Sequence, residues 1–154
     1  MAEPEFAFNT HNGLRLHFAS AGPPEGQPVI LLHGFPEYWY AWRHQIPALA
    51  AAGYRVIAPD QRGYNLSDKP QSVTDYGIEK LAADILSLAD HLELQTFHLV
   101  GHDWGAAVAW QLAINHPERL RTLSILNVPH PAVMSRHLRS DIRQIFKSWY
   151  IFFF

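Results

Sequence analysis

One carboxylate, Asp103, stands between an apolar run and a stretch of small residues. Glycines lie two residues before it, at Gly101, and two residues after it, at Gly105. This spacing is typical of a nucleophile elbow, a tight strand-to-helix turn that holds one side chain up at the end of a sheet. Serine is the usual nucleophile of such a turn, and here aspartate occupies its position.

An aspartate in this turn would do different chemistry from a serine. Its carboxyl has an ordinary pKa of about 4, so it is ionised at neutral pH and needs no base before it attacks. A carboxylate suits displacement at a saturated carbon, such as an epoxide or alkyl halide carbon. The product is an alkyl ester of the enzyme, and its release needs water activated by a general base, usually histidine. The alternative is that Asp103 only caps a helix, and the flanking glycines make that the weaker interpretation.

Two backbone N–H groups are expected beside Asp103. Trp104 follows it at the start of a predicted helix, and Phe35 follows His33-Gly34 after an earlier apolar run. An oxyanion hole of this kind takes one N–H from the residue after the nucleophile and one from the loop after the earlier strand. We therefore predict Phe35 and Trp104 as the oxyanion-hole donors, while their rings are also explained by ordinary core packing.

Tyr150 is a candidate proton donor. A tyrosine hydroxyl above Asp103 could hydrogen-bond a leaving oxygen, because a phenol pKa of about 10 suits a developing alkoxide. Tyr150 lies in an aromatic run, Ser148 to Phe152, and a tyrosine in such a run is more often explained by packing.

Other polar residues are predicted to be structural. His33 and His102 stand in separate tight loops without the ligand spacing of a metal site, so we expect no metal and expect each ring to bond nearby backbone. Neither is expected to be the catalytic base. Asp60 and Arg62 are expected to pair with each other and brace their loop.

The elements that must position these residues alternate between strand and helix. Glu5–Thr10 and Leu14–Ser20 are predicted to form an antiparallel hairpin around Asn12-Gly13, because Asn-Gly is the strongest short hairpin signal. Apolar runs predict strands over 28–32, 54–58, 96–100 and 120–126. Helical spacing predicts a first helix over 38–52, which Gly53 ends. A second helix is predicted from a cap at Thr74 or Asp75 to Leu92, and a third from the elbow to about His116. The result is an α/β fold with a mostly parallel sheet and helices on both faces, which binds ligands beyond the carboxyl ends of its strands.

Composition excludes several classes of protein. The chain has 154 residues, of which 48% are hydrophobic, enough for one domain with a sizeable core. Its formal net charge is −2 with no block of like charge, so nucleic acid is not an expected partner. There is no cysteine, which excludes disulfides. An acidic start without an apolar core argues against a signal peptide, and no apolar run is long enough to span a membrane, so the expected compartment is the cytoplasm.

Several separate motifs resemble those of the α/β-hydrolase-fold epoxide hydrolases and together cover nearly the whole chain. They are His33-Gly34-Phe35-Pro36-Glu37 with Trp39 and Trp42-Arg43-His44-Gln45, Pro59-Asp60-Gln61-Arg62-Gly63-Tyr64 through Ser67-Asp68-Lys69-Pro70, Gly101-His102-Asp103-Trp104-Gly105, Asn127-Val128-Pro129-His130-Pro131, and Ser148-Trp149-Tyr150. One departure is Asn65, which stands where many relatives have glycine.

The resemblance implies roles for these residues. Asp103 matches the nucleophile that attacks an epoxide carbon, Phe35 and Trp104 match the oxyanion-hole positions, and Tyr150 matches the first of two cap tyrosines that bind and protonate the epoxide oxygen. The implied substrates are a small-molecule epoxide and water, with no cofactor. A helical cap follows the sixth strand in this family, so residues 1–131 are expected to form the α/β-hydrolase core and 132–154 the beginning of the cap. The family's second tyrosine, acid and histidine base have no counterpart here.

Two alternatives remain open at this stage. The first is a haloalkane dehalogenase, which shares the aspartate followed by tryptophan, although Phe35-Pro36-Glu37 and Tyr150 favour the epoxide reaction. A fluoroacetate-type dehalogenase is disfavoured, because it would have arginine in place of Trp104. The other alternative is a non-catalytic fragment or interaction protein. Because the sequence stops on a run of large apolar residues, 149–154, we expect it to be the first part of a longer chain that does not turn over by itself.

Overall fold

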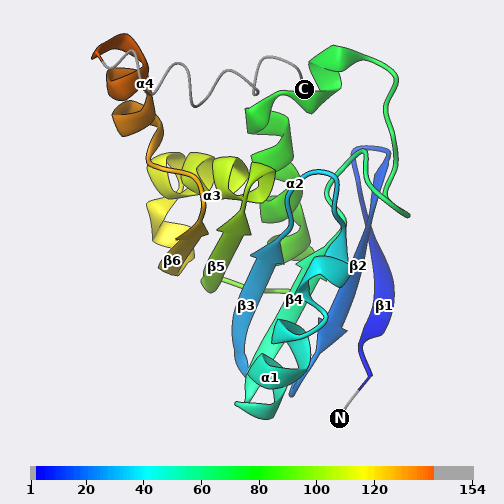
Figure 1. Cartoon of the computed structure of the whole chain (residues 1–154). Helices are drawn as coiled ribbons and strands as arrows, with labels where there is room; N and C mark the ends of the chain where they lie inside the picture. The colour runs from blue at the N-terminus through cyan, green and yellow to red at the C-terminus, as the bar shows by residue number, and fades with distance from the viewer. Residues whose placement is uncertain (1–2, 141–154) are drawn as a thin grey trace.

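The computed structural model of the chain describes residues 3–140, which form one six-stranded sheet with helices around it (Figure 1). The strand order is β1-β2-β4-β3-β5-β6. The hairpin β1–β2 and the pair β2–β4 are antiparallel, and the other neighbours are parallel. The strands are β1 Glu5–His11, β2 Leu14–Ala21, β3 Gln27–Leu32, β4 Tyr54–Pro59, β5 Phe97–His102 and β6 Leu120–Leu126. The predicted α/β fold is thereby confirmed.

The opening hairpin turns where the sequence predicts. Asn12 has φ 49° and Gly13 has φ 79°, so both central residues of the two-residue turn have positive φ. A type I′ turn needs positive φ at both positions, and its twist matches that of the flanking strands. Asn-Gly therefore sets the register of β1 against β2.

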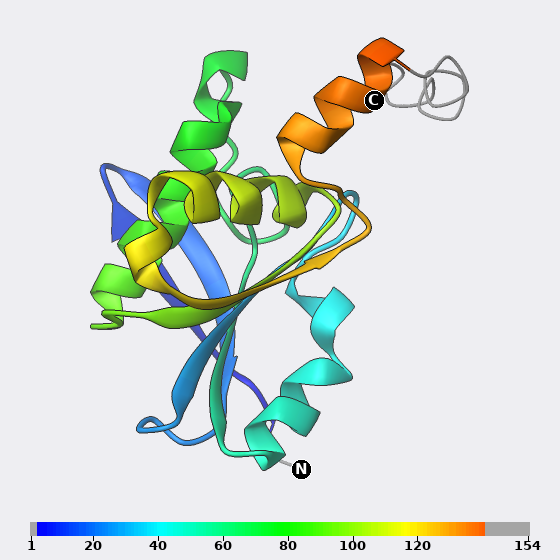
Figure 2. The ribbon, with the colours of Figure 1, turned by 90° about the vertical axis from the view of Figure 1, so that its left-hand side faces the viewer.

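Helices cover both faces of the sheet, as predicted (Figure 2). Alternate residues of β3 point to opposite sides: Ile30 and Leu32 belong to one buried cluster, Val29 and Leu31 to the other. The first cluster contains residues of α2 and α3, and the second contains residues that precede or lie in α1. The helices are α1 Gln45–Ala51, α2 Ile78–His91, α3 Trp104–Asn115 and α4 Pro131–Ser140, and the short 3₁₀ turns are η1 Trp39–Trp42, η2 Val73–Tyr76 and η3 Pro117–Arg119. Across residues 3–140, each helix is too short or too polar to cross a lipid bilayer.

The helix predicted over 38–52 is broken in two. The 3₁₀ turn η1 ends at Trp42, and α1 begins only at Gln45. A continuous helix would place Pro47 in its interior, where the ring clashes with the carbonyl four residues earlier. Starting at Gln45 puts Pro47 in the first turn, where a missing N–H has no cost. Gly53, at φ 88°, follows the end of α1 as predicted.

The predicted cap of α2 is wrong. Thr74 and Asp75 lie in η2, and Gly77 is the residue that precedes α2. The cause is a long-range contact, since the Arg62 guanidinium donates to the Asp75 carbonyl at 2.7 Å. This bond holds η2 as a separate turn beside the loop after β4.

The first turn of α3 lies very close to β3 and β5. A Cβ atom on Gly101 would lie 2.6 Å from the Gly105 carbonyl oxygen and 2.7 Å from Ala106 Cα. A Cβ on Gly105 would lie 2.4 Å from the Leu32 carbonyl oxygen. Real Cβ contacts are not that short, so only glycine fits at either position, and the small residues of the sequence are explained by packing.

Gly101→Ala is expected to lower the free energy of unfolding by about 1–3 kcal/mol, because the obstructing atoms are backbone and cannot move aside. The matched control is Gly77→Ala, where φ is −60° and a Cβ would lie 3.6 Å from its nearest neighbour, Glu79 Oε2. The control should change stability by less than about 1 kcal/mol. Urea unfolding of both variants measures the difference, and equal effects would contradict the packing argument.

Candidate active site

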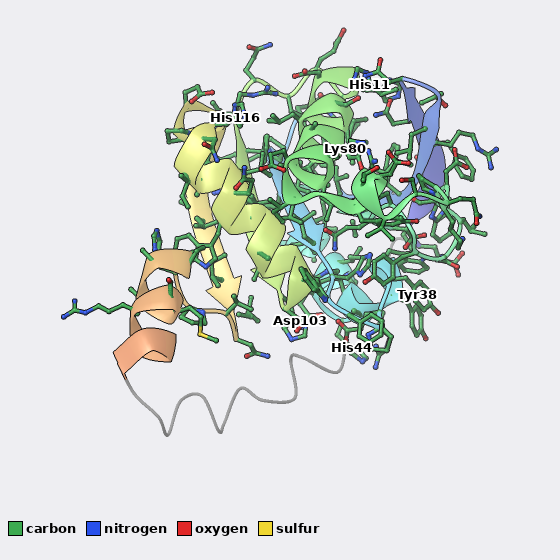
Figure 3. The ribbon with its side chains drawn as sticks, turned by 90° about the horizontal axis from the view of Figure 1, so that it is seen from above. His11, Tyr38, His44, Lys80, Asp103 and His116 are labelled. Atoms are coloured by element: carbon green, nitrogen blue, oxygen red, sulfur yellow. The ribbon has the colours of Figure 1, made fainter. Side chains whose placement is uncertain are left out.

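Asp103 occupies the turn between β5 and α3 in a strained backbone conformation. Its φ is 51° and its ψ is −120°, a region that side-chain-bearing residues seldom adopt and that costs about 1–3 kcal/mol. Its carbonyl accepts hydrogen bonds from the N–H groups of Ala106 and Ala107, at 2.9 and 3.2 Å, so α3 starts immediately after it. Figure 3 shows Asp103 at this end of α3. The turn is the strand–turn–helix arrangement that the glycine spacing predicts.

The Asp103 side chain faces the loop after β3 rather than its own helix. Asp103 Oδ1 accepts a hydrogen bond from the Phe35 N–H at 2.9 Å, and the side chain makes no capping bond to α3. The loop is packed against it so closely that a Cβ on Gly34 would lie 2.6 Å from Asp103 Cβ. Among the residues whose side chains are described, 3–136, the Phe35 bond is the only hydrogen bond to this carboxylate. One oxygen is therefore oriented by a backbone donor, and Trp104 adds an N–H at the start of α3, where helical N–H groups have no partner within the helix.

Glu37 connects the loop after β3 to the turn at Asp103. Its Oε2 accepts from the Gly34 N–H and from His102 Nδ1, each at 3.2 Å. A carboxylate only accepts, so His102 Nδ1 carries a hydrogen, and the other ring nitrogen, Nε2, is hydrogen-bonded with the Asn127 side-chain amide at 2.9 Å. His102 thus bonds two side chains rather than the backbone that the sequence led us to expect. These bonds join the carboxyl ends of β3, β5 and β6.

His33 is a fully buried ring that joins two loops. Its Nδ1 donates to the Gly34 carbonyl at 2.8 Å, and its Nε2 accepts from the Gln61 N–H at 3.0 Å. The backbone bond to Gly34 agrees with the prediction. Burial lowers the pKa of His33 below its ordinary 6.5, although the Gly34 bond and the charges of Asp60 and Glu37 oppose that shift. His33 is therefore neutral, with both ring nitrogens bonded.

The predicted pair of Asp60 and Arg62 does not form. Asp60 is fully buried and accepts from His17 Nδ1 at 2.6 Å and from the Trp39 N–H at 2.9 Å. Arg62 instead donates from Nε and Nη2 to the two oxygens of Asp84 on α2, at 2.6 Å each. The pairing of β2 with β4 brings His17 to Asp60, which leaves Arg62 to reach α2. Both residues still brace their loop, through different partners.

Asn65 keeps the shape of that loop where the resemblance implies glycine. Its φ is 42°, in the left-handed region that asparagine tolerates better than most residues. Its Nδ2 also donates to Asp60 Oδ2 at 2.8 Å. The departure from glycine is therefore accommodated.

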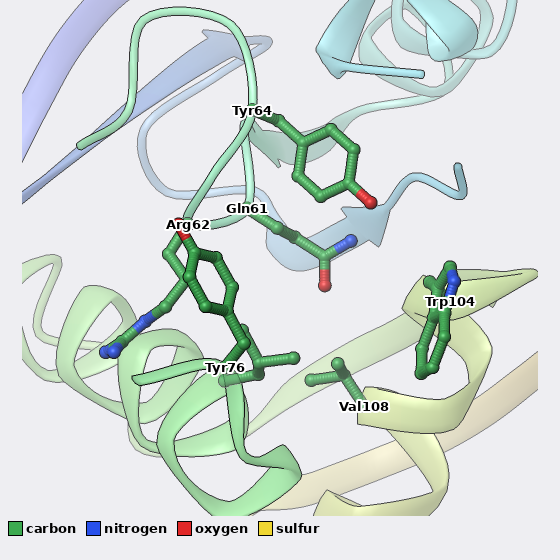
Figure 4. Close-up of a pocket in the computed structure, with 7 residues that line it drawn as sticks. Gln61, Arg62, Tyr64, Tyr76, Trp104 and Val108 are labelled. Atoms are coloured by element: carbon green, nitrogen blue, oxygen red, sulfur yellow. The ribbon is translucent and has the colours of Figure 1, made fainter. Parts of the chain in front are cut away.

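A pocket of about 140 Å³ opens between the loop after β4 and the first turns of α3 (Figure 4). Burial raises the pKa of Tyr64, which lines it, and the charges of Asp103 and Tyr76 raise that pKa further. Trp104, the residue after Asp103, also lines the pocket. The lining residues are Gln61, Arg62, Tyr64, Tyr76, Leu81, Trp104 and Val108. The sequence did not single out Gln61, Tyr64 or Glu37 as site residues, because a loop carries no periodicity; the only signal was their presence in the resembling motifs.

Two further predictions from the sequence concern Tyr150 and metal binding. Tyr150 lies outside the described residues. Within residues 3–136, whose side chains the structure describes, no three His, Asp or Glu side chains are grouped so that they could hold a metal ion.

The chain is similar to known proteins of the alpha/beta hydrolase fold. The sequence profile of the alpha/beta hydrolase fold family matches residues 27–153. The chain is 50% identical over 147 residues to an AB hydrolase superfamily protein of Bacillus subtilis, covering 96% of this chain and 51% of that protein. It is also 50% identical over 118 residues to epoxide hydrolase A of Mycobacterium tuberculosis, covering 77% of this chain and 37% of that protein. The chain thus spans about half, or less, of the length of these relatives.

A similar solved structure belongs to a set described as novel epoxide hydrolases of the alpha/beta hydrolases superfamily from metagenomes of hot environments. It superposes with a TM-score of 0.89 at 42% identity, covering 98% of this chain and 50% of that chain.

The buried, neutral His33 predicts a loss of stability in acid. Because its pKa is below 6.5 in the folded chain, the unfolded chain binds the proton more readily, and the free energy of unfolding falls as pH drops below about 6.5. Urea unfolding at pH 7.5 and 5.5 should show this fall, and His33→Gln should reduce its size. Histidine NMR resonances provide the direct check: a His33 ring that titrates at or above 6.5 would refute the argument.

Proposed function

The chain belongs to the α/β-hydrolase-fold family, and from that premise we propose that the protein is an epoxide hydrolase in which the Asp103 carboxylate attacks an epoxide carbon. The observation that carries the proposal is the Phe35 N–H bound to Asp103 Oδ1 at 2.9 Å in a turn of positive φ. Relatives of 42–50% identity that are named epoxide hydrolases support the same reaction.

The first step follows from the orientation of the carboxylate. Oδ1 is held by Phe35, so the other oxygen, Oδ2, is the one that attacks. A bond forms between Oδ2 and the epoxide carbon, the carbon–oxygen bond of the ring breaks, and the epoxide oxygen leaves as an alkoxide that must take a proton. We assign that proton to Tyr150, as the family resemblance implies. The product is an alkyl ester of Asp103 with a free hydroxyl on the neighbouring carbon.

The second step is hydrolysis of the ester. Water adds to the ester carbon, and the negative charge develops on Oδ1, the oxygen that already accepts from Phe35. A second donor, the Trp104 N–H, would share that charge. Cleavage returns the carboxylate and releases a vicinal diol, so that one epoxide and one water give one diol.

The base for this second step is proposed to lie outside residues 3–140. His33 has both ring nitrogens bonded and is fully buried, and His102 has both ring nitrogens bonded to Glu37 and Asn127. Neither can readily take a proton from water at Asp103. We therefore retain the proposal that residues 1–131 form a core and that 132–154 begin a cap, and that other segments supply the base.

The 154-residue chain is expected to form the ester without releasing it. After incubation with styrene oxide, intact-protein mass spectrometry should show a single adduct with the mass of the epoxide, and peptide mapping should locate it at Asp103. The adduct should fall to background in Asp103→Ala and persist in Asp90→Ala, a matched control at an exposed carboxylate that pairs with Arg119.

Other outcomes favour other functions. Multiple turnovers to diol by this chain would contradict the assignment of the base. Halide release from a bromoalkane without epoxide opening would identify a haloalkane dehalogenase, which uses the same attack on carbon. No reaction of Asp103 with either compound would favour a non-catalytic protein.

A further inference from the structure

Gln61 presents one amide oxygen to the pocket in a fixed orientation. The residue is 4% exposed, and its Nε2 donates to the His33 carbonyl at 2.7 Å. A carbonyl only accepts, so the amide nitrogen must face His33 and the oxygen must face away from it. Figure 4 shows that oxygen directed into the space between Gln61, Val108 and Trp104. The Gln61 N–H is also bonded, to His33 Nε2, so the residue is held at both its backbone and its side chain.

This oxygen has no partner of its own. In the described part of the chain, no donor bonds Gln61 Oε1. Among the other donors that line the pocket, the Arg62 guanidinium binds Asp84 and the Asp75 carbonyl, and the Tyr76 hydroxyl donates to the Pro70 carbonyl at 2.9 Å. The Tyr64 hydroxyl and the Trp104 indole N–H also line the pocket but do not bond Gln61 Oε1. Because Gln61 Oε1 faces the pocket and is open to solvent, water can donate to it, and a ligand that brings its own donor replaces that water.

The pocket has the size of a substituent rather than of a whole ligand. Complete small-molecule sites occupy roughly 300–1,000 Å³, whereas this pocket has about 140 Å³. A dry cavity of about 150 Å³ is known to accommodate benzene. Leu81, Val108 and the Trp104 ring supply apolar walls, and Trp104 directly follows Asp103.

We propose that this pocket receives a ring-sized, mainly apolar substituent of the epoxide that carries a hydroxyl group, and that Gln61 Oε1 accepts a hydrogen bond from that hydroxyl. Gln61 is then a specificity-determining residue. The inference rests on the proposed function in treating Asp103 as the reacting group beside the pocket. A neutral hydrogen bond of this kind should change the relative binding of two ligands roughly 3- to 10-fold.

The acceptor is tested by two inert probes of nearly equal shape, benzyl alcohol and ethylbenzene. Dissociation constants come from NMR titrations of the 154-residue chain that follow the Trp104 indole N–H. Gln61→Met, which is apolar and of similar length, should shift the ratio of the two constants against benzyl alcohol roughly 3- to 10-fold. Tyr76→Phe is the matched control on the same pocket wall, and its ratio should equal that of the wild type. An unchanged ratio in Gln61→Met overturns the proposal.

The wild-type chain provides a readout that does not depend on the folding of a variant. Benzyl alcohol should shift the side-chain amide resonances of Gln61, and ethylbenzene should leave them in place while it shifts the Trp104 indole. Equal responses of the Gln61 amide to both probes overturn the proposal.

A pair of reactive epoxides distinguishes a failure of this inference from a failure of the proposed function. The rates of adduct formation at Asp103 are compared for 3-(hydroxymethyl)styrene oxide and 3-ethylstyrene oxide, in the wild type and in Gln61→Met. A hydroxymethyl-to-ethyl rate ratio that falls roughly 3- to 10-fold in the variant supports both statements. Labelling of Asp103 with a ratio that Gln61→Met leaves unchanged overturns the role of Gln61 alone. If neither epoxide labels Asp103 while the probe ratio depends on Gln61, the proposed function fails and the acceptor site stands.

Discussion

The close approach of α3 to the sheet is the constraint on which the rest of the candidate site depends. Gly101 and Gly105 leave no room for a side chain, and Gly34 is pressed equally closely against Asp103 from the loop after β3. With α3 so near, the chain can leave β5 and enter the helix only through a residue of positive φ. That residue is Asp103, and the strained turn is what directs its carboxylate to the Phe35 N–H.

A network of polar groups, buried at His33 and Asp60 and partly exposed at Glu37 and His102, holds the loops around this turn. Glu37 connects the loop after β3 to His102, and His33 connects the same loop to the one after β4. Asp60 fastens that second loop to His17 on β2. Groups of this kind are expensive to bury singly but specify one arrangement when every member is bonded. Three of the loops at the carboxyl edge of the sheet are therefore positioned by each other as well as by their strands.

Local features of the sequence were sufficient to predict the order of the elements. Asn12-Gly13 predicts its hairpin because the turn needs positive φ at two adjacent residues, and the spacing of Gly101 and Gly105 predicts the turn at Asp103 because the contact is made within one strand–turn–helix unit. The hydrogen-bond partners of the buried charged side chains could not be predicted in this way. Asp60 bonds His17, 43 residues away, and Arg62 bonds Asp84, 22 residues away, so both pairings depend on which elements become neighbours. The orientation of the Gln61 amide likewise depends on a residue far along the chain, because its nitrogen bonds the His33 carbonyl.

The sharing of the His33 ring and carbonyl by two loops has a consequence for protein engineering. Gln61 meets His33 through both its N–H and its side chain, and His33 bonds the Gly34 carbonyl one residue before Phe35. A replacement at position 61 chosen to widen the range of accepted molecules would also remove the side-chain bond to the His33 carbonyl, two residues before the Phe35 N–H that orients the carboxylate. Leu81 and Val108 line the same pocket through apolar packing, and libraries built on them can reshape it without removing that bond.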